Sequence, residues 1–215
     1  MNLPVNIDAT ALFRAAYENR YTWDTSFPGY SADVTYKHGE VTFSGQAKVV
    51  PDARMGFKGE VSGIENEDVL KAVQGQLWEI AIHRVRRPFE QTHAGNSFEL
   101  GSTDADGAVQ VMVLGKGEGD HYKVRNNEVS LVHRHIHGTV VTINTFSTFD
   151  TGEGYLSATY DSVYHDPATG AQKGEKQVFE DSYEKVGDFY ILNRRVITTE
   201  TDGSVEYCFS NFQLL

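Results

Sequence analysis

From about Phe89 to its last residue, the chain reads as one short β-strand after another, separated by turns rich in Gly, Asn and Asp. The turn signals recur at about ten-residue intervals, which is typical of a meander, sandwich or barrel. Two helices are predicted earlier, over residues 8–19 and 66–86. This order predicts a mainly β (α+β) fold: a large curled antiparallel sheet or half-barrel of about 9–11 strands, with two helices packed at its concave side or mouth.

Two amphipathic segments account for the predicted helices. In the first, Asp8 is a suitable N-cap, and residues three and four positions apart form one apolar face, which contains Leu12, Phe13, Ala16 and Tyr17. The second begins after Asn66 and ends before Pro88. Its predicted buried stripe contains Leu70, Val73, Leu77, Ile80 and Ala81, with Trp78 at the margin.

The clearest hairpin covers residues 32–49. Apolar and polar residues alternate on both sides of a His38-Gly39 turn, as expected when one face of an antiparallel sheet is covered. In the last strand the alternation changes parity between Phe209 and Phe212. One extra residue near Ser210 and Asn211 would restore a common face, so we predict a β-bulge there.

Composition and charge narrow the possible environments and partners. The chain has 30 acidic and 19 basic side chains and a formal net charge of −11 at pH 7, which repels phosphate backbones, so we expect no nucleic-acid partner. The single cysteine, Cys208, fits a reducing compartment. The first twenty residues lack the pattern of a secretory signal, and no run approaches the roughly 20 apolar residues of a membrane span. We expect a single domain over residues 1–215, cytoplasmic and not membrane-spanning, of undetermined oligomeric state.

A histidine trio provides the metal-like spacing in this chain. His133, His135 and His137 occupy alternate positions, so on a strand all three imidazoles would project from one face. Two of them could bind one Zn²⁺ or Fe²⁺, with His121 on the preceding strand as a candidate third ligand. The alternative interpretation is a solvent-facing strand that uses histidine, in which case no cofactor is implied.

Aromatic residues mark a candidate site for an apolar ligand. A long antiparallel sheet that curls over two helices encloses either a filled core or a cavity, and aromatic rings suit both. If a cavity is present, the candidate ligand-binding residues come from the loop at 21–30, the hairpin and the second helix: Trp23, Phe27, Tyr30, Tyr36, Phe43 and Trp78.

The sequence contains no complete catalytic signature. Glu180 and Asp181 are adjacent, so on a strand they face opposite sides and cannot act as a glycosidase pair. Glycines lie in turns and not in the strand-to-helix pattern of a nucleotide-binding loop. Cys208 lies in an apolar strand, where cysteine usually acts as a small hydrophobe. These features favour a protein that is not an enzyme.

Four segments carry a resemblance to a known family. They are 12–24 (LFRAAYENRYTWD), 27–30 (FPGY), 150–155 (DTGEGY) and 179–187 (FEDSYEKVG). With them the chain resembles an uncharacterised family of similar length, a domain of unknown function found mainly in cyanobacteria and plastid-bearing eukaryotes. The resemblance implies a photosynthetic lineage, and it brings no reaction or catalytic residue. The histidine trio is not part of the family pattern.

A more distant likeness concerns the fold. The order of an early helix, three strands, another helix and a long antiparallel run is similar to the LolA-type lipoprotein carriers, open half-barrels lined with apolar groups and covered by helices. This likeness implies an apolar cargo, such as a lipid, a pigment or a hydrophobic protein segment.

These observations lead to one main functional hypothesis and two alternatives. We expect non-enzymatic binding of an apolar small molecule, either a lipid or a pigment, or of a hydrophobic partner, in a cavity between the sheet and the helices. The first alternative is a metal-dependent enzyme with a site at His133 and His135. The second is a chromophore lyase or assembly chaperone that acts on pigment proteins in photosynthetic organisms.

Overall fold

The computed structural model describes residues 8–215, which form two compact units. The first unit comprises residues 8–20 and 87–177, and the second comprises residues 21–86 and 178–215. Of the twenty N-terminal residues considered for a secretory signal, residues 1–7 lie outside the described residues. The assignment of residues 1–215 to a single domain stays a prediction.

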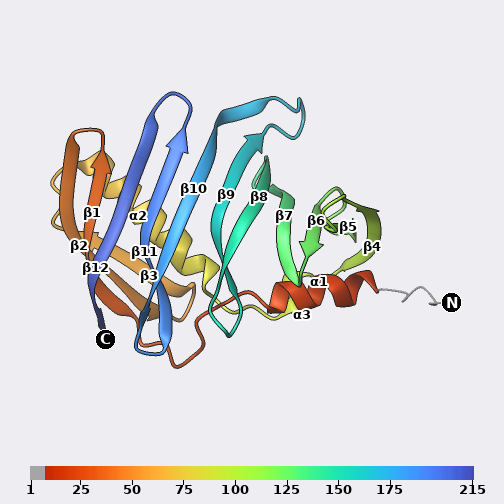
Figure 1. Ribbon diagram of the computed structural model, residues 1–215, viewed down its shortest axis with the longest axis horizontal. Helices are drawn as coiled ribbons and strands as arrows, with labels where there is room; N and C mark the ends of the chain where they lie inside the picture. The colour runs from red at the N-terminus through yellow and green to blue at the C-terminus, as the bar shows by residue number, and fades with distance from the viewer. Residues whose placement is uncertain (1–7) are drawn as a thin grey trace. The chain divides into compact units, whose positions relative to one another are not determined.

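The second unit contains one long helix and most of the longest strands (Figure 1). Its hydrogen-bonded strand order is β3-β2-β1-β12-β11-β10, and all registered pairs are antiparallel. The boundary between the two units falls within β10. The elements are β1 (Tyr30–His38), β2 (Val41–Asp52), β3 (Gly56–Ser62), α2 (Glu67–His83), β10 (Gln172–Val186), β11 (Phe189–Thr199) and β12 (Gly203–Leu214).

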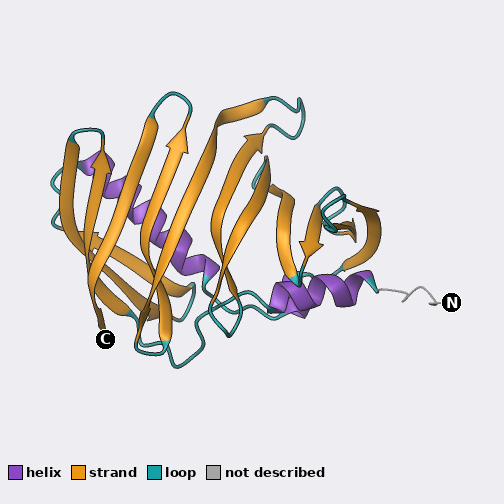
Figure 2. Cartoon of the chain, viewed as in Figure 1, coloured by secondary structure: helices purple, strands orange, loops and turns teal. Residues whose placement is uncertain are grey.

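The first unit contains two helices and six further strands (Figure 2). Its strand order is β9-β8-β7-β6-β5-β4, again antiparallel throughout. The elements are α1 (Ala9–Glu18), α3 (Phe89–Thr92), β4 (Asn96–Thr103), β5 (Val109–Gly115), β6 (His121–Arg125), β7 (Glu128–Ile136), β8 (Thr139–Asp150) and β9 (Tyr155–His165).

The predicted fold class is confirmed. The chain is mainly β with antiparallel pairing, and residues 8–215 form twelve strands, slightly more than expected. They also form three helices, one more than predicted. The additional helix, α3, is a four-residue turn that follows Pro88, where the sequence indicated the start of the strands. None of the helices in residues 8–215 is long and apolar enough to cross a membrane.

Local capping chemistry explains where both main helices begin. The Asp8 carboxylate accepts the Ala11 N–H at 2.9 Å, and the Asn66 side-chain oxygen accepts the N–H groups of Asp68 and Val69 at 3.1 and 3.0 Å. The second helix ends at His83, three residues before the predicted end. Both N-caps predicted from the sequence are confirmed.

The structure also confirms the hairpin and the bulge. Strands β1 and β2 pair from Tyr30 with Val49 to His38 with Val41. Between β1 and β12 the register shifts at the predicted position, and Asn211 takes a left-handed φ of 54°. An extra residue in the left-handed region is a common form of β-bulge, and it keeps Phe209 and the following residues in register with β1.

Each helix packs closely against strands of its own unit. In the first unit the Phe13 ring of α1 stacks on Tyr122 of β6, with ring centroids 4.2 Å apart. In the second unit Val73 and Leu77 of α2 are fully buried, and Leu77 lies over Gly59 of β3. A methyl group added at Gly59 would lie 2.9 Å from the Leu77 Cγ atom, so the helix and the strand are closely packed at this position.

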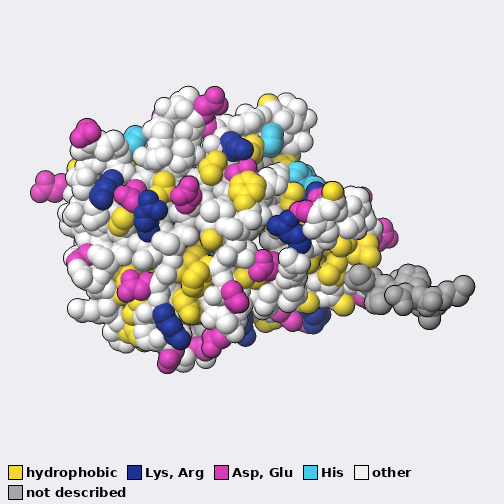
Figure 3. Space-filling view, viewed as in Figure 1, with side chains coloured by type: hydrophobic (Ala, Val, Ile, Leu, Met, Phe, Trp, Pro, Cys, Tyr) yellow, Lys and Arg dark blue, Asp and Glu magenta, His cyan; other side chains and the backbone are white. Residues whose placement is uncertain are grey.

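Charged side chains cover the surface without forming one dominant field in the view of Figure 3. Acidic side chains are spread over the visible face and are interspersed with lysine and arginine. Several pair locally, for example Lys37 with Glu206 and Lys58 with Glu60. On the face that Figure 3 shows, acidic and basic side chains are therefore mixed, and no single charged surface stands out.

His93 makes the core of the first unit sensitive to acid. It is 7% exposed and lies among aromatic rings that include Phe13, Phe89 and Tyr122. Burial, with additional effects from the positive charges of Arg134 and Arg20, lowers the pKa of His93 from 6.5 to about 4, although Asp120 opposes the shift. The folded protein therefore holds this histidine in its neutral form.

We predict that His93 contributes acid instability between pH 6.5 and pH 4. In this range the unfolded chain binds a proton at His93 more readily than the folded chain, so stability is complete above pH 6.5 and falls as the pH decreases. The loss attributable to His93 approaches about 3 kcal/mol near pH 4. Urea unfolding of the wild type and of His93→Phe across this range tests it. If the two proteins lose stability in parallel, His93 is not the group responsible.

Candidate functional site

Three of the predicted ligand-binding residues form the aromatic core of the second unit. Trp23, Phe27 and Tyr30 are each at most 2% exposed. The Trp23 and Phe27 rings stack with centroids 4.0 Å apart, and both contact Phe57 edge-on. The Trp23 indole N–H donates to the Tyr190 carbonyl at 3.1 Å. These rings therefore pack against one another in a buried core.

The other three predicted ligand-binding residues do not join them. Tyr36 and Phe43 are a half-buried cross-strand pair on β1 and β2, with ring centroids 6.4 Å apart. Trp78 is 50% exposed on α2. The structure thus does not gather the six aromatic residues into one site, and a ligand-binding role for them stays a prediction.

The histidines are brought together only in part. His121 of β6 and His133 of β7 are register partners, and their rings stack with centroids 4.4 Å apart. His133 Nδ1 lies 2.8 Å from Thr142 Oγ1, and His135 Nδ1 lies 2.9 Å from an Asp120 carboxylate oxygen. Each of these two imidazoles therefore already has a polar partner.

His137 departs from the predicted arrangement. It lies beyond the end of β7 with a left-handed φ of 49°, and it forms a tight turn with Gly138 at 74°. Strand alternation consequently applies to His133 and His135 and not to His137. The prediction that three imidazoles project from one strand face is wrong for this residue, because the hairpin turns there.

Burial favours the neutral forms of His121 and His133. Burial lowers the pKa of His121. Burial also lowers the pKa of His133, with the neighbouring His121 and His135 contributing in the same direction. In residues 8–215 no three His, Cys, Asp or Glu side chains are arranged so that they could hold a metal ion. A Zn²⁺ or Fe²⁺ role for these histidines stays a prediction from the sequence.

A pocket occurs where β7 and β8 stop pairing. The two strands pair from Ile136 with Thr139 to Leu131 with Asn144, and in the described residues their register ends there although both strands continue. The pocket has a volume of about 140 Å³. We call it the β7–β8 pocket, and it is lined by Arg125, Asn126, Glu128, Val129, Ser130, Thr145, Phe146, Ser147 and Thr148.

A bulge in β8 creates one wall of this pocket. The register of β8 against β9 shifts between Thr145 and Ser147 and again between Ser147 and Thr148. Phe146 is therefore left out of the ladder, and its side chain is 57% exposed. Bulges of this kind occur frequently beside functional sites because they redirect a side chain.

A buried hydrogen bond secures the opposite wall. The Val129 N–H of β7 donates to the Tyr155 hydroxyl at 3.0 Å. Burial raises the pKa of Tyr155 to about 12, so the hydroxyl stays protonated. The start of β9 is held in turn by Asn19, whose carbonyl accepts the Tyr155 N–H and whose amide donates to the Asn127 carbonyl, both at 3.0 Å.

Glu128 is the acidic group of the pocket. The Thr148 hydroxyl lies 3.1 and 3.0 Å from its two carboxylate oxygens, so Thr148 bridges β8 to β7 and orients the carboxylate. Ser147 Oγ is hydrogen-bonded to Thr159 Oγ1 at 2.7 Å. The pocket is therefore lined by one carboxylate, several hydroxyl groups, the Phe146 ring and the Arg125 side chain.

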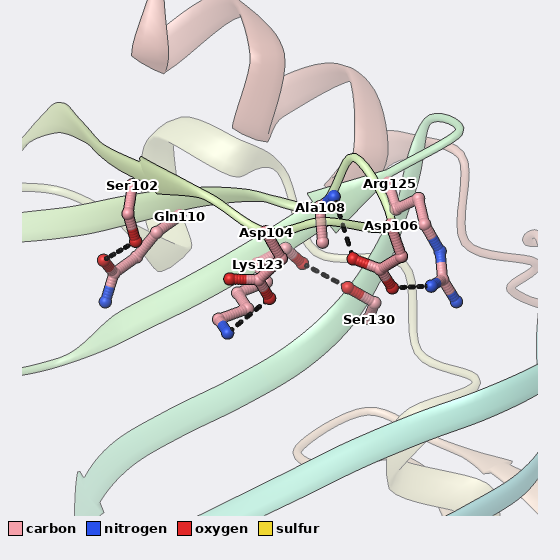
Figure 4. Close-up of polar contacts among 8 residues, drawn as sticks. All are labelled: Ser102, Asp104, Asp106, Ala108, Gln110, Lys123, Arg125 and Ser130. Atoms are coloured by element: carbon pink, nitrogen blue, oxygen red, sulfur yellow. Dashed lines mark hydrogen bonds and ion pairs between the residues drawn. The ribbon is translucent and has the colours of Figure 1, made fainter.

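The basic side chains beside the pocket are already paired, as Figure 4 shows. Arg125 forms an ion pair with Asp106, and Lys123 donates to Asp104 at 2.6 Å. The backbone N–H of Ala108 lowers the pKa of Asp106, and Arg125 contributes to the same effect, so this carboxylate is ionised. In the described residues no ion pair is formed by Glu128 itself.

The size of the pocket limits what it can hold. Pockets for drug-sized ligands measure roughly 300–1,000 Å³. At about 140 Å³, the β7–β8 pocket can take a compact polar group but not a complete lipid or pigment. Any larger ligand would have to lie partly outside it, next to Phe146.

The pocket was not predicted from the sequence, although two local features beside it, a bulge and a turn, leave a pattern there. Phe146 and Phe149 are three residues apart in one strand, so without a bulge they would lie on opposite faces. Phe209 and Phe212 have the same spacing, from which the bulge in β12 was predicted. The turn at Asn126 and Asn127 is also visible in the sequence, and both residues have left-handed φ values, 53° and 60°. The contact between Val129 and Tyr155 has no local signal.

We predict that Tyr155→Phe destabilises this region specifically. The substitution leaves the buried Val129 N–H without an acceptor, which costs about 1–3 kcal/mol. Urea unfolding measures the loss, and hydrogen exchange at the Val129 amide locates it. Tyr36→Phe in the second unit is the matched control and should leave that amide protected. Unchanged exchange at Val129 in Tyr155→Phe would show that the bond does not hold β7 in place.

Comparison with known proteins gives a family and several loosely similar structures. The model of a family described as protein of unknown function (DUF3386) matches residues 5–215. A search of curated proteins finds no match. A solved domain from Vibrio parahaemolyticus, assigned to outer membrane lipoprotein sorting, is 11% identical with a TM-score of 0.41, covering 96% of this chain and 91% of that chain.

Two other solved structures are similar at the same level. A LolA superfamily protein from Nitrosomonas europaea is 7% identical with a TM-score of 0.40, covering 97% of this chain and 94% of that chain. A DUF1329 family protein from Desulfovibrio piger is 10% identical with a TM-score of 0.33, covering 96% and 90%. The expected photosynthetic lineage stays a prediction.

Proposed function

We propose that this chain, which belongs to the DUF3386 family of proteins of unknown function, binds an amphipathic small molecule without chemically changing it. The polar head of the ligand occupies the β7–β8 pocket, and its apolar part packs against Phe146. The observation that carries this proposal is the position of Phe146, which is 57% exposed at the rim of a polar pocket.

The exposure of Phe146 supports the proposal because the bulge leaves this side chain unpaired beside the pocket. Single exposed apolar residues are common on protein surfaces. Phe146, however, has the largest exposed fraction among the large exposed hydrophobic side chains of residues 8–215. It also lies directly beside Glu128 and Thr148, which gives polar and apolar contacts within one site. This combination matches a ligand with a polar end and an apolar end.

The packing of the helices supports a site at the pocket over one beneath a helix. Phe13 and Tyr122 are in direct ring contact under α1, and Leu77 contacts Gly59 under α2. At these two points the helices contact the strands directly. Our proposal therefore keeps the apolar-ligand hypothesis from the sequence but assigns the ligand to a different position, between β7 and β8.

We predict that Phe146→Ala weakens the binding of single-chain amphiphiles roughly tenfold. Covering a half-exposed aromatic ring removes apolar surface worth about 1.4 kcal/mol, which corresponds to that factor. Titration calorimetry with dodecyldimethylphosphine oxide, a single-chain amphiphile with a compact neutral head, measures the affinity below its micelle concentration. The matched control is Ile136→Ala, which removes a 38% exposed apolar side chain from the other end of β7.

The control defines the contradicting result. Ile136→Ala should bind like the wild type because Ile136 does not line the pocket. If Phe146→Ala and Ile136→Ala bind equally, or if the wild type binds no single-chain amphiphile whatever the charge of its head, the proposed function is incorrect.

A further inference from the structure

The charge balance of the β7–β8 pocket points to the chemistry of the head group. Resting on the proposed function, we infer that the pocket recognises an organic ammonium group, held between the Glu128 carboxylate and the Phe146 ring.

Within residues 8–215, Glu128 has no cationic partner. It faces Arg125 across the Asn126-Asn127 turn as a register partner on β6. The Arg125 guanidinium nevertheless pairs with Asp106, and the next basic residue on the same strand, Lys123, pairs with Asp104. In the described residues Glu128 takes part in no ion pair, so its charge is available to a ligand.

The Glu128 carboxylate is held in place by the Thr148 hydroxyl. Both of its oxygens lie within hydrogen-bonding distance of the single Thr148 hydroxyl. A carboxylate has about four lone-pair positions, and one hydroxyl donor uses only part of this capacity. The remaining acceptor positions can bind an N–H donor or stabilise a quaternary ammonium by charge alone.

The aromatic ring of Phe146 lines the same pocket. Phe146 and Glu128 both line it, one from the bulge of β8 and the other from the start of β7. A cation near the face of an aromatic ring is attracted by the ring electrons, and recognition of quaternary ammonium groups commonly uses such rings. A carboxylate and a ring together favour an ammonium over a neutral polar head.

An anionic head group fits the pocket poorly. Arg125 could attract it, but Asp106 already neutralises the guanidinium and Glu128 would repel the incoming charge. The net charge of −11 on the whole chain acts in the same direction at low salt. The volume of about 140 Å³ also suits a compact group such as an ammonium.

The same chemistry could come from a free small cation or from the head of an amphiphile. Four probes distinguish these sources and test the inference: dodecyltrimethylammonium, dodecyldimethylphosphine oxide, sodium dodecanoate and choline. The first three share a twelve-carbon chain and carry cationic, neutral and anionic heads. Each is titrated into the full-length protein below its micelle concentration.

We predict that dodecyltrimethylammonium binds at least about tenfold more tightly than dodecanoate, and that added salt reduces this preference. Glu128→Gln keeps an oxygen that can accept the Thr148 hydrogen bond but removes the charge. It should bind dodecyldimethylphosphine oxide like the wild type and lose the preference for the cationic head. The control is Glu99→Gln, which removes an exposed carboxylate on β4 outside the pocket and should keep the preference.

The outcomes separate this inference from the proposed function. Equal affinity for the three heads overturns the ammonium inference and leaves amphiphile binding intact. Absence of binding by every amphiphile overturns both. If choline binds as tightly as dodecyltrimethylammonium, the site recognises a free small cation and the role proposed for the alkyl chain is wrong. Retained preference in Glu128→Gln shows that another group selects the head.

Discussion

The hydrogen bond from the Val129 amide to the Tyr155 hydroxyl is the interaction on which the candidate site depends. A buried backbone N–H must have an acceptor, and in a continuous sheet this acceptor would be the neighbouring strand. Here the acceptor is a side chain from the start of β9. Because the Tyr155 hydroxyl accepts the Val129 N–H, the pairing of β7 with β8 can end at Leu131 and Asn144 without leaving this N–H unpaired. The pocket lies between residues 128–130 of β7 and residues 145–148 of β8.

The β8 bulge and the charge arrangement complete the site. The bulge leaves Phe146 outside the ladder and exposed, while Thr148 restores a connection to β7 through Glu128. Asp104 and Asp106, in the turn between β4 and β5, pair with the basic residues of β6. A small polar pocket with one unpaired carboxylate and one exposed ring is the result, and this combination is the basis for proposing an amphipathic ligand.

Much of the fold could be predicted from the sequence because local chemistry determines it. The caps at Asp8 and Asn66, the hairpin around Gly39 and the bulge near Asn211 all follow from residues adjacent in the chain. The pocket could not be predicted in the same way. It depends on Val129 meeting Tyr155, 26 residues later, and no periodic pattern encodes that contact. Similarly, the sequence leaves open whether Trp23 and Phe27 belong to a core or to a ligand site, and their distant contacts with Phe57 and Phe189 make them core.

The most direct test of the account is to locate the bound ligand by NMR. Amide chemical shifts of the full-length protein are recorded while dodecyltrimethylammonium is added below its micelle concentration. We expect saturable changes in amide chemical shift, concentrated at residues 128–130 and 145–148 on the two strands that line the pocket. Shifts concentrated instead in the second unit, around residues 21–36 or in α2, would contradict the central claim that the β7–β8 pocket is the binding site.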